Sequence, residues 1–554
     1  MHTHKKYISF LNTFTFRQWV LFYMGLGLVL VSLLSFLYTA AKNSQTTIPV
    51  SGGTYTEGIV GNIRSINPVL AVTEIEKEVT NLVFRGLFGK DENGEIFPLL
   101  ADSYTVSEDG LTYTIILKDE IYFHDKKPVT AQDVEFTVKQ IKDPTIKSPR
   151  QAAFSGVDIK VIDDKTIEFK LKQRYADFLD TLTVGILSKE EWKDVTTEQF
   201  ALTEKNMSPI GAGPYAFESL KENKGIPQKI TFTRNKRYIE GKPYIKKIDL
   251  TFFSTEKEAL NALNTKEIGT LTGVTPENIS IVKDNLTIEK AVSPRLFGLF
   301  FNTNTEPIFQ DHSVIEALEY AINKPEIIET VFNGYAVQKD SAVPFIESEA
   351  YKPYDVEKAA EILSKKGWEK NTEGIWEKNG TPLKFTITTT DIDELKLVNV
   401  LIQQQLETFG AQVLIKTYET TTFSQEVLNA RNYQVVLFGQ AVNKPSNLYA
   451  FWHSNERNAP GLNITMYVNQ RVDTLLDRIK KELDTEAQTE NLQALDAELE
   501  KDKPAIVLYQ PMSISVSSRE IFNRKYNTSL QTSRFFNVHL WSTKTDHVWK
   551  LFTK

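Results

Sequence analysis

The chain has 554 residues, of which 41% are hydrophobic and 24% are charged, as is typical of folded globular proteins. One hydrophobic core rarely supports this length, so we expect roughly two or three structural units. The net charge of -7 argues against nucleic acids and anionic membrane surfaces as partners, because both bind basic patches. No cysteine is present, which excludes disulfides, thiolate metal sites and a cysteine nucleophile.

An uncharged apolar run covers residues 19–41. As a helix, it is long enough to cross a hydrocarbon core of about 30 Å. Basic residues are more numerous before the run than just after it, so the positive-inside bias places residues 1–18 in the cytoplasm and the body outside. A cleaved signal peptide and a buried core helix are the alternatives; the length of the run favours an uncleaved anchor. Residues 42–50 are predicted to be a polar linker.

Residues 99–138 carry the most informative pattern of the chain. Alternating apolar residues over 111–117 predict a half-buried strand, and the Asp-Gly pair just before it supplies the turn of a hairpin. Thr130 and Asp133 have the spacing of a capping box, so we expect a helix to begin there.

Two further blocks follow. Residues 209–215 read PIGAGPY, and two glycines with two prolines indicate a backbone with special dihedral angles at a crossing between structural units. A strand is expected to follow, up to residue 220. In the third block, residues 297–334, Ser313 and Glu316 are predicted to cap a helix.

The remaining chain alternates between helical and strand patterns. We expect helices over 355–367, 395–410, 472–483 and 492–499, and strands over 413–417, 434–439 and 504–509. The run 434–439 is apolar throughout, as is typical of a strand buried on both faces. This alternation predicts α/β lobes with helices on both faces of a sheet.

The blocks at 99–138, 209–215 and 297–334 resemble signatures of the family 5 extracellular solute-binding proteins, which include peptide, dipeptide and nickel receptors of bacterial ABC importers. The resemblance implies a two-lobed periplasmic-binding-protein-like α/β fold (type II, cluster C-like). It implies the following parts: lobe I from 51–85, 209–292 and 512–554, an inserted subdomain at 86–208, and lobe II at 293–511. The missing lipid-anchoring cysteine departs from the family pattern.

The sequence contains no familiar catalytic motif. Its seven histidines form no H-E-x-x-H helix, and neither a G-x-S-x-G elbow nor a phosphate loop occurs. His124, in an F-H-D element, is interpreted as part of a structural turn, and His453 is the one to reconsider if a metal is found. We therefore expect a binding protein that is not an enzyme, with no catalytic residue, cofactor or metal site.

The resemblance implies that a ligand is held in a cleft between two lobes, which close around it by a hinge. Candidate ligand-binding residues come from the loops facing such a cleft, with packing or solvation as the alternative for each: Ile63, Arg64, Asn67, Arg295, Phe301, Asn302, Gln440, Asn443, Asn447, Tyr449 and Trp452. Arg64 and Arg295 could each pair with a ligand carboxylate.

One loop departs from the family. Peptide-binding relatives often place an aspartate there, which pairs with the α-ammonium group of the peptide. Here the loop offers Gln440, Asn443, Lys444 and Asn447, with no carboxylate before Glu456. A buried ammonium without an anion is costly. Either an acid from elsewhere reaches it, or the amino terminus of the ligand is not anchored this way, which suits long peptides better than dipeptides.

The predicted function is the extracytoplasmic substrate-binding subunit of an ABC importer. Its expected partners are a peptide ligand, the transmembrane permease subunits with separate ATPase subunits, and the plasma membrane through a single N-terminal helix. The protein is expected to be a monomer and to bind no nucleic acid. The alternatives are a two-lobed surface receptor, interaction protein or chaperone not coupled to transport, or the same fold binding a nickel chelate or haem.

Overall fold

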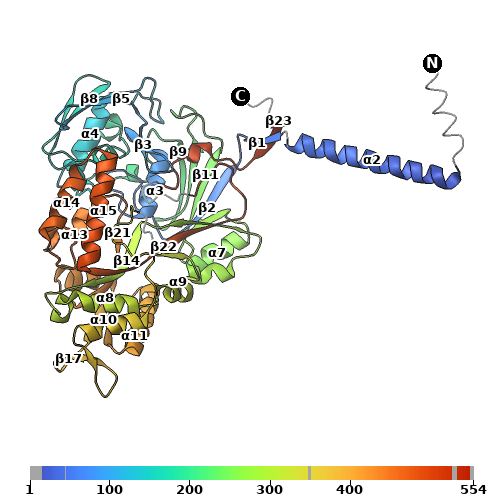
Figure 1. Ribbon diagram of the computed structural model, residues 1–554. Coiled ribbons are helices and arrows are strands. Elements are labelled where there is room, and N and C mark those ends of the chain that lie inside the picture. Colours follow the sequence, from blue (N-terminus) through green and yellow to red (C-terminus); the bar gives the residue numbers. More distant parts are fainter. Residues whose placement is uncertain (1–14, 44, 347–350, 527–532, 550–554) are drawn as a thin grey trace.

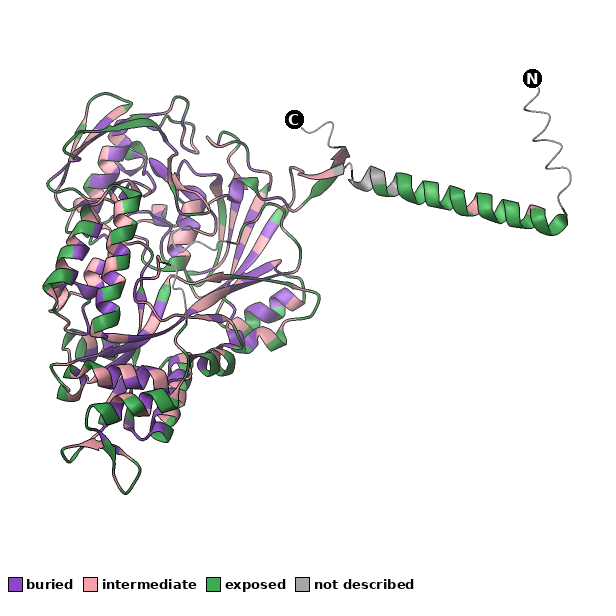
Figure 2. Ribbon diagram, viewed as in Figure 1, coloured by how far each residue is buried: buried purple, intermediate pink, exposed green. Residues whose placement is uncertain are grey.

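The computed structural model describes residues 15–43, 45–346, 351–526 and 533–549. Within these residues, the body is organised around one 12-stranded sheet of mixed direction, whose central strands are largely buried (Figures 1 and 2). The main path of this sheet runs in the order β20 (Gln412–Tyr418), β19 (Lys384–Thr390), β21 (Val435–Ala441), β14 (Arg295–Phe301), β22 (Ala505–Ser517), β12 (Thr270–Thr272), β2 (Thr54–Val60), β11 (Lys247–Phe253), β10 (Ile226–Arg234) and β9 (Tyr215–Asn223). Parallel pairs such as β19 with β20 agree with the predicted α/β class.

The long strand β22 is shared by both halves of the body. Its first part pairs with β14 and β15 (Ala336–Gln338), and its second part pairs with β12 and β13 (Thr287–Val292). Only residues 293–294 separate β13 from β14, so this connection and β22 cross together from one half to the other, and the Ser293 N–H donates to the Pro511 carbonyl at 2.8 Å. We call the half with β2 lobe I and the half with β14 lobe II. The predicted lobe boundaries, at 292/293 and 511/512, stay a prediction.

Helices cover both faces of the sheet in lobe II. One face packs on α8 (His312–Ala321), α9 (Lys324–Phe332), α10 (Val356–Lys365) and α11 (Asp393–Phe409). The other face packs on α13 (Asn447–Trp452), α14 (Gln470–Lys481) and α15 (Thr485–Asp502). In β21, Val435 and Leu437 enter the first core and Val436 enters the second, so the strand is buried on both faces as predicted. In lobe I, α3 (Glu74–Val83) and α7 (Glu256–Asn264) belong to different cores.

Residues 86–208, predicted to be an inserted subdomain, are called the inserted segment below. They contain a separate antiparallel sheet in the order β5 (Ala101–Val106), β6 (Thr112–Leu117), β8 (Thr166–Leu171) and β7 (Val157–Val161), with helix α4 (Ala131–Lys142) beside it. The predicted hairpin is present, and Gly110 adopts a φ of 68° in its turn. Both the backbone N–H and the hydroxyl of Thr130 donate to the Asp133 carboxylate at 2.8 Å, and α4 begins at the next residue. The local capping signal therefore predicts this helix correctly.

The capping prediction at Ser313 is wrong. Helix α8 begins at His312, and its N-cap is Asp311, whose carboxylate accepts from the Ser313 N–H at 3.2 Å. Asp311 and Ser313 both have side chains that can cap a helix. Asp311 is the cap used, and a start at His312 places Val314 and Ile315 in the core. The other predicted helices and strands of this half are present with bounds that differ by a few residues, except that α15 already begins at Thr485 and β22 continues to Ser517.

Helix α2 (Phe16–Asn43) projects away from the body (Figure 1). Its segment Phe16–Leu37 is apolar and long enough to cross a membrane, and none of it is buried against the body. A signal sequence would have the same length and composition. After α2, strand β1 (Gln45–Pro49) pairs in antiparallel register with β23 (Thr545–Trp549). Part of the predicted linker, residues 42–50, thus forms a ribbon with a strand from the other end of the chain.

Candidate functional site

Two of the sequence blocks contact each other through His124. Its backbone N–H donates to the Gly211 carbonyl at 2.8 Å, and its ring nitrogen Nδ1 accepts from the Gly211 N–H at 3.2 Å. The other ring nitrogen, Nε2, lies 3.1 Å from the Gly213 carbonyl and donates to it. Because one ring nitrogen must accept and the other must donate, these contacts select the neutral imidazole. His124 therefore has the structural role expected from the sequence.

Replacing His124 with glutamine is expected to reduce the acid sensitivity of the fold. Burial lowers the pKa of His124 from 6.5 to about 4. Between these values the unfolded state binds more protons than the folded state, so stability falls as the pH falls. The variant should lose about 2 kcal/mol less stability than the wild type between pH 7 and pH 5. Urea denaturation at both pH values measures this; the exposed His312→Gln variant is the control, and equal pH slopes in all three proteins would contradict the prediction.

Several predicted residues gather where β21 ends and β14 begins. Arg295 is the register partner of Ala441, and Leu296 is the partner of Gln440. Arg295 and Asn443 are exposed, whereas Gln440 is only 1% exposed. The side-chain oxygen and nitrogen of Gln440 have no hydrogen-bond partner among the described residues. This end of the lobe II sheet thus combines an exposed guanidinium with a buried, unpaired carboxamide.

Phe301 and Asn302 lie at the opposite end of the same sheet. Strand β14 runs antiparallel to β21, so Phe301 pairs with Val435, six positions and about 20 Å from Arg295. Phe301 is fully buried, with its ring 4.7 Å from that of Phe309, and Asn302 donates to the Arg431 carbonyl at 3.1 Å. The prediction that these two residues share a site with Gln440 is wrong, because strand direction separates them.

Three other candidates are structural. Ile63 lies in the core of lobe I. The Asn67 amide donates to Asn206 at 2.9 Å, and its oxygen accepts from the Val69 N–H at 2.8 Å, so this buried side chain joins its loop to Asn206. Trp452 is 1% exposed and packs in the core beneath α14. Each was predicted to face the ligand and instead faces a core or its own loop.

The remaining candidates keep surface that a ligand could reach. Arg64 is exposed. Asn447 begins helix α13, and its side-chain oxygen is buried without a partner in the part of the chain that the structure describes. The ring of Tyr449 stacks on His453 at 4.2 Å, and the Lys480 ammonium lies 4.3 Å from the ring centre.

The inserted segment contacts lobe II through Lys444. The Lys444 ammonium donates to the Tyr175 hydroxyl at 3.0 Å and to Asp180 at 3.2 Å, and it lies 3.7 Å from Asp177. Burial favours the neutral amine, but the charge of Asp180 and then the oxygens of Tyr175 and Asp177 raise the pKa of Lys444 above its usual range. Acidic residues from elsewhere therefore do reach this loop. Asp177 and Asp180 lie far from Lys444 in the sequence, so no local pattern could predict this contact.

Elsewhere, a surface pocket of about 410 Å³ lies at the outer edge of the lobe II sheet and contains none of the predicted site residues. It is lined by Glu306, Ile308, Thr381, Pro382, Lys384, Phe385, Thr386, Leu414 and Gln434. Among the residues that the structure describes, no group of three or more His, Cys, Asp or Glu side chains is arranged to hold a metal ion.

A two-lobed α/β body joined by neighbouring crossing strands, with polar loops at strand ends, is the type II periplasmic-binding-protein fold, which the solved structural neighbours share. The chain belongs to the bacterial extracellular solute-binding proteins, family 5: the model of the middle part of this family matches residues 95–459. This match confirms the family resemblance that the three sequence blocks carry.

The relatives cover nearly the whole chain. It is 24% identical over 525 residues to the oligopeptide-binding protein AppA of Bacillus subtilis (strain 168), covering 91% of this chain and 94% of AppA. It is 25% identical over 523 residues to the glutathione-binding protein GsiB of Escherichia coli (strain K12), covering 89% and 95%. The structure of NikZ from Campylobacter jejuni in complex with Ni(L-His) superposes with a TM-score of 0.70 at 25% identity, covering 88% and 99%. These similarities agree with the family that the model match shows.

Proposed function

We propose that this protein is the extracytoplasmic substrate-binding subunit of an ABC importer and that its ligands are peptides. The observation that carries the proposal is the unpaired Gln440 carboxamide at the carboxyl end of β21. A carboxamide presents donors and an acceptor, the complement of a peptide group, so a bound main chain would satisfy both atoms. Ligands of open α/β sheets bind at such strand ends. The nearby Arg295 is suited to a carboxylate.

The cellular setting follows from the same proposal. Helix α2 would be an uncleaved membrane anchor, with the ribbon of β1 and β23 joining it to the body. The loaded body would dock as a monomer on transmembrane permease subunits whose ATPase subunits are separate chains. The protein would bind and release its ligand without chemical change; its relatives AppA and GsiB are named as binding proteins.

Identification of co-purified ligands tests the proposal directly. The full chain is purified in detergent, denatured, and the released small molecules are identified by mass spectrometry. Peptides of mixed sequence are the expected result, and their lengths would define the ligand range. Adding such a peptide at about 100 times its Kd should raise the free energy of unfolding by about 2.7 kcal/mol. An empty protein whose stability no peptide changes would favour the non-transport or non-peptide alternatives.

Replacing Gln440 with leucine is expected to stabilise the unliganded protein and weaken ligand binding. A buried carboxamide without partners costs about 1–3 kcal/mol, which an apolar side chain of similar size avoids. The matched control is Gln403→Leu, because the Gln403 amide donates to the Val413 carbonyl at 2.7 Å. This control should lose stability and keep its peptide affinity. A Gln440→Leu variant that binds the co-purified peptides as well as the wild type would remove Gln440 from the site.

A further inference from the structure

The contact between Lys444 and the inserted segment has the chemistry of an ammonium-binding site. A lysine ammonium has three N–H donors. The Tyr175 hydroxyl and Asp180 accept two of them, at 3.0 and 3.2 Å. The Asp177 oxygen that faces Lys444, 3.7 Å away, is buried and has no hydrogen-bond partner in the described chain. Two carboxylates and a phenol oxygen thus surround one cation.

Asp177 depends on Lys444 for its cation. Asp180 also pairs with Lys90 at 2.6 Å and interacts electrostatically with the Arg150 guanidinium, whereas the cation that lies near Asp177 is Lys444. The side chains of Asp177 and Asp180 are 17% and 19% exposed. Without Lys444, Asp180 would keep Lys90 and Arg150, but Asp177 would lose the one ion pair recorded for it among the described residues, and a carboxylate removed from water needs a counter-ion. The site therefore requires a cation at the position of the Lys444 ammonium.

The site lies beside the proposed ligand-binding loop and joins two parts of the molecule. Lys444 directly follows Asn443 and lies four residues after Gln440. Its partners belong to the inserted segment, at the start of the short helix α5 (Phe178–Thr181). A backbone hydrogen bond of 3.0 Å from Ala176 to the Lys480 carbonyl runs alongside the charged contact. An amino group bound here would therefore also join the inserted segment to lobe II.

We propose that Tyr175, Asp177 and Asp180 form an ammonium-binding site whose resident occupant is Lys444. The chain itself, rather than the amino terminus of a ligand, supplies the cation that joins the inserted segment to lobe II. The consequence for specificity rests on the proposed peptide-binding function: ligands need no free α-ammonium group at this end of the site, so peptides with blocked and with free amino termini bind alike.

The occupancy of the site is tested without any ligand. The full chain in detergent is treated with limiting acetic anhydride, and acetylation is followed for Lys444 and for the exposed Lys481 by mass spectrometry. Lys444 should react about tenfold or more slowly, because charge-assisted hydrogen bonds hold its amine. In the Asp177→Asn/Asp180→Asn double variant the two lysines should react at similar rates. Similar rates in the wild type would overturn the proposal.

The consequence for specificity is tested with two probes, pentaalanine and N-acetyl-pentaalanine. The wild type should bind both with affinities within about twofold, whereas Lys444→Met should bind the free form about tenfold or more tightly than the acetylated form, because its α-ammonium can enter the vacated site. Lys90→Met is the matched control: it removes a cation from the same Asp180 but leaves Lys444 in place, and should keep the wild-type ratio. An unchanged ratio in Lys444→Met overturns the proposal. If no variant binds either probe, the peptide function fails, and the acetylation rates still decide the occupancy.

Discussion

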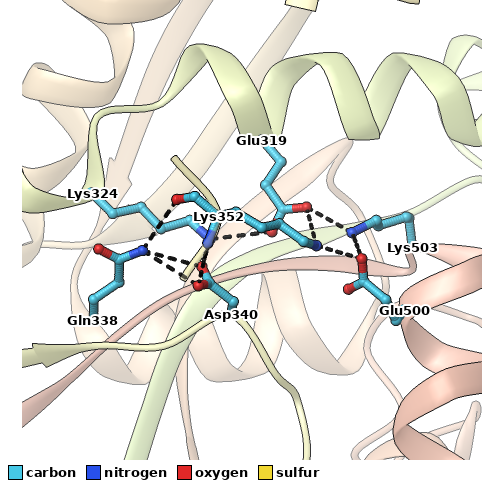
Figure 3. Close-up of polar contacts among 7 residues, drawn as sticks. All are labelled: Glu319, Lys324, Gln338, Asp340, Lys352, Glu500 and Lys503. Atoms are coloured by element: carbon cyan, nitrogen blue, oxygen red, sulfur yellow. Dashed lines mark hydrogen bonds and ion pairs between the residues drawn. The ribbon is translucent and has the colours of Figure 1, made fainter. Parts of the chain in front are cut away.

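Replacing Glu319 with glutamine is expected to lower the free energy of unfolding by about 3–5 kcal/mol, because it leaves buried ammonium groups without their shared carboxylate. The Glu319 side chain, in helix α8, is 2% exposed. Figure 3 shows its carboxylate among the side chains of Lys324, Lys352 and Lys503. Its oxygens lie 3.1 Å from the Lys324 ammonium, 2.8 Å from that of Lys352 and 2.7 Å from that of Lys503. These lysines come from three separate segments of lobe II, so one carboxylate joins all three.

The effect of this substitution should depend on pH. Burial raises the pKa of Glu319, but Lys324, Lys503 and Lys352 outweigh it and lower the pKa from 4.5 to about 2. A lowered folded-state pKa stabilises the protein above pH 4.5, and this stabilisation is lost as the pH falls towards 2. Urea denaturation should therefore show a larger difference between variant and wild type at pH 7 than at pH 3.

The matched control is Glu500→Gln. Glu500 pairs with Lys352 at 2.5 Å and also with Lys503, but its side chain is 46% exposed, so water and salt screen these pairs. The control should lose no more than about 1 kcal/mol. If both variants lost the same free energy of unfolding, burial would not be the reason that Glu319 stabilises the protein.

The Arg534→Met variant is expected to lose a similar amount, about 3–5 kcal/mol, from lobe I. Arg534 pairs with Glu57, a residue of β2 that is fully buried and also accepts from the Tyr55 hydroxyl at 3.0 Å. Arg534 also donates to the Thr272 hydroxyl at 3.3 Å. Removing the guanidinium leaves the Glu57 carboxylate inside lobe I without an ion-pair partner among the described residues, and Glu78, 3.9 Å from the guanidinium, also loses a cation. The same contact ties the returning C-terminal segment to the sheet.

A double-mutant cycle tests the origin of this loss. Adding Glu57→Gln to Arg534→Met should restore part of the stability, because the buried group is then neutral. Arg174→Met is the control, since the exposed Arg174 donates only to backbone carbonyls among its recorded contacts, and it should change stability by less than about 1 kcal/mol. A double variant less stable than Arg534→Met would show that loss of the hydrogen bonds, rather than the unpaired charge, dominates.

Elements with local signals were predictable from the sequence. The hairpin before Thr112 and the helix after Thr130 depend on residues that lie within a few positions of each other. Strand β22 was only half predicted: the expected strand ends at residue 509, whereas β22 continues to Ser517 through Pro511. Proline normally ends a strand, but here the backbone of Pro511 is the register partner of Ala336, and alternation resumes with Ile514 and Val516 in a core.

The candidate site was predictable only as a set of loops. Gln440 and Asn443 were chosen because they follow a buried strand, a local property, and Gln440 is the residue on which the proposed function now depends. Phe301 and Asn302 were chosen on equally local grounds and lie at the wrong end of the sheet. Periodicity reports that a strand exists but not in which direction its neighbours run, so it cannot say which loops meet.

The family, the α/β class and most helices and strands could be predicted from the amino-acid sequence, because turn chemistry, caps and periodicity act between residues close along the chain. The pairing of distant charges depends on how the chain packs: Glu319 meets Lys503, Glu57 meets Arg534, and Lys444 meets Asp180. Lys444 and Asp180 lie 264 residues apart in the sequence. A lysine has the same sequence signature whether it is solvated or buried against carboxylates. The difference arises from desolvation and proximity in three dimensions, which exist only once the lobes and the inserted segment have packed together.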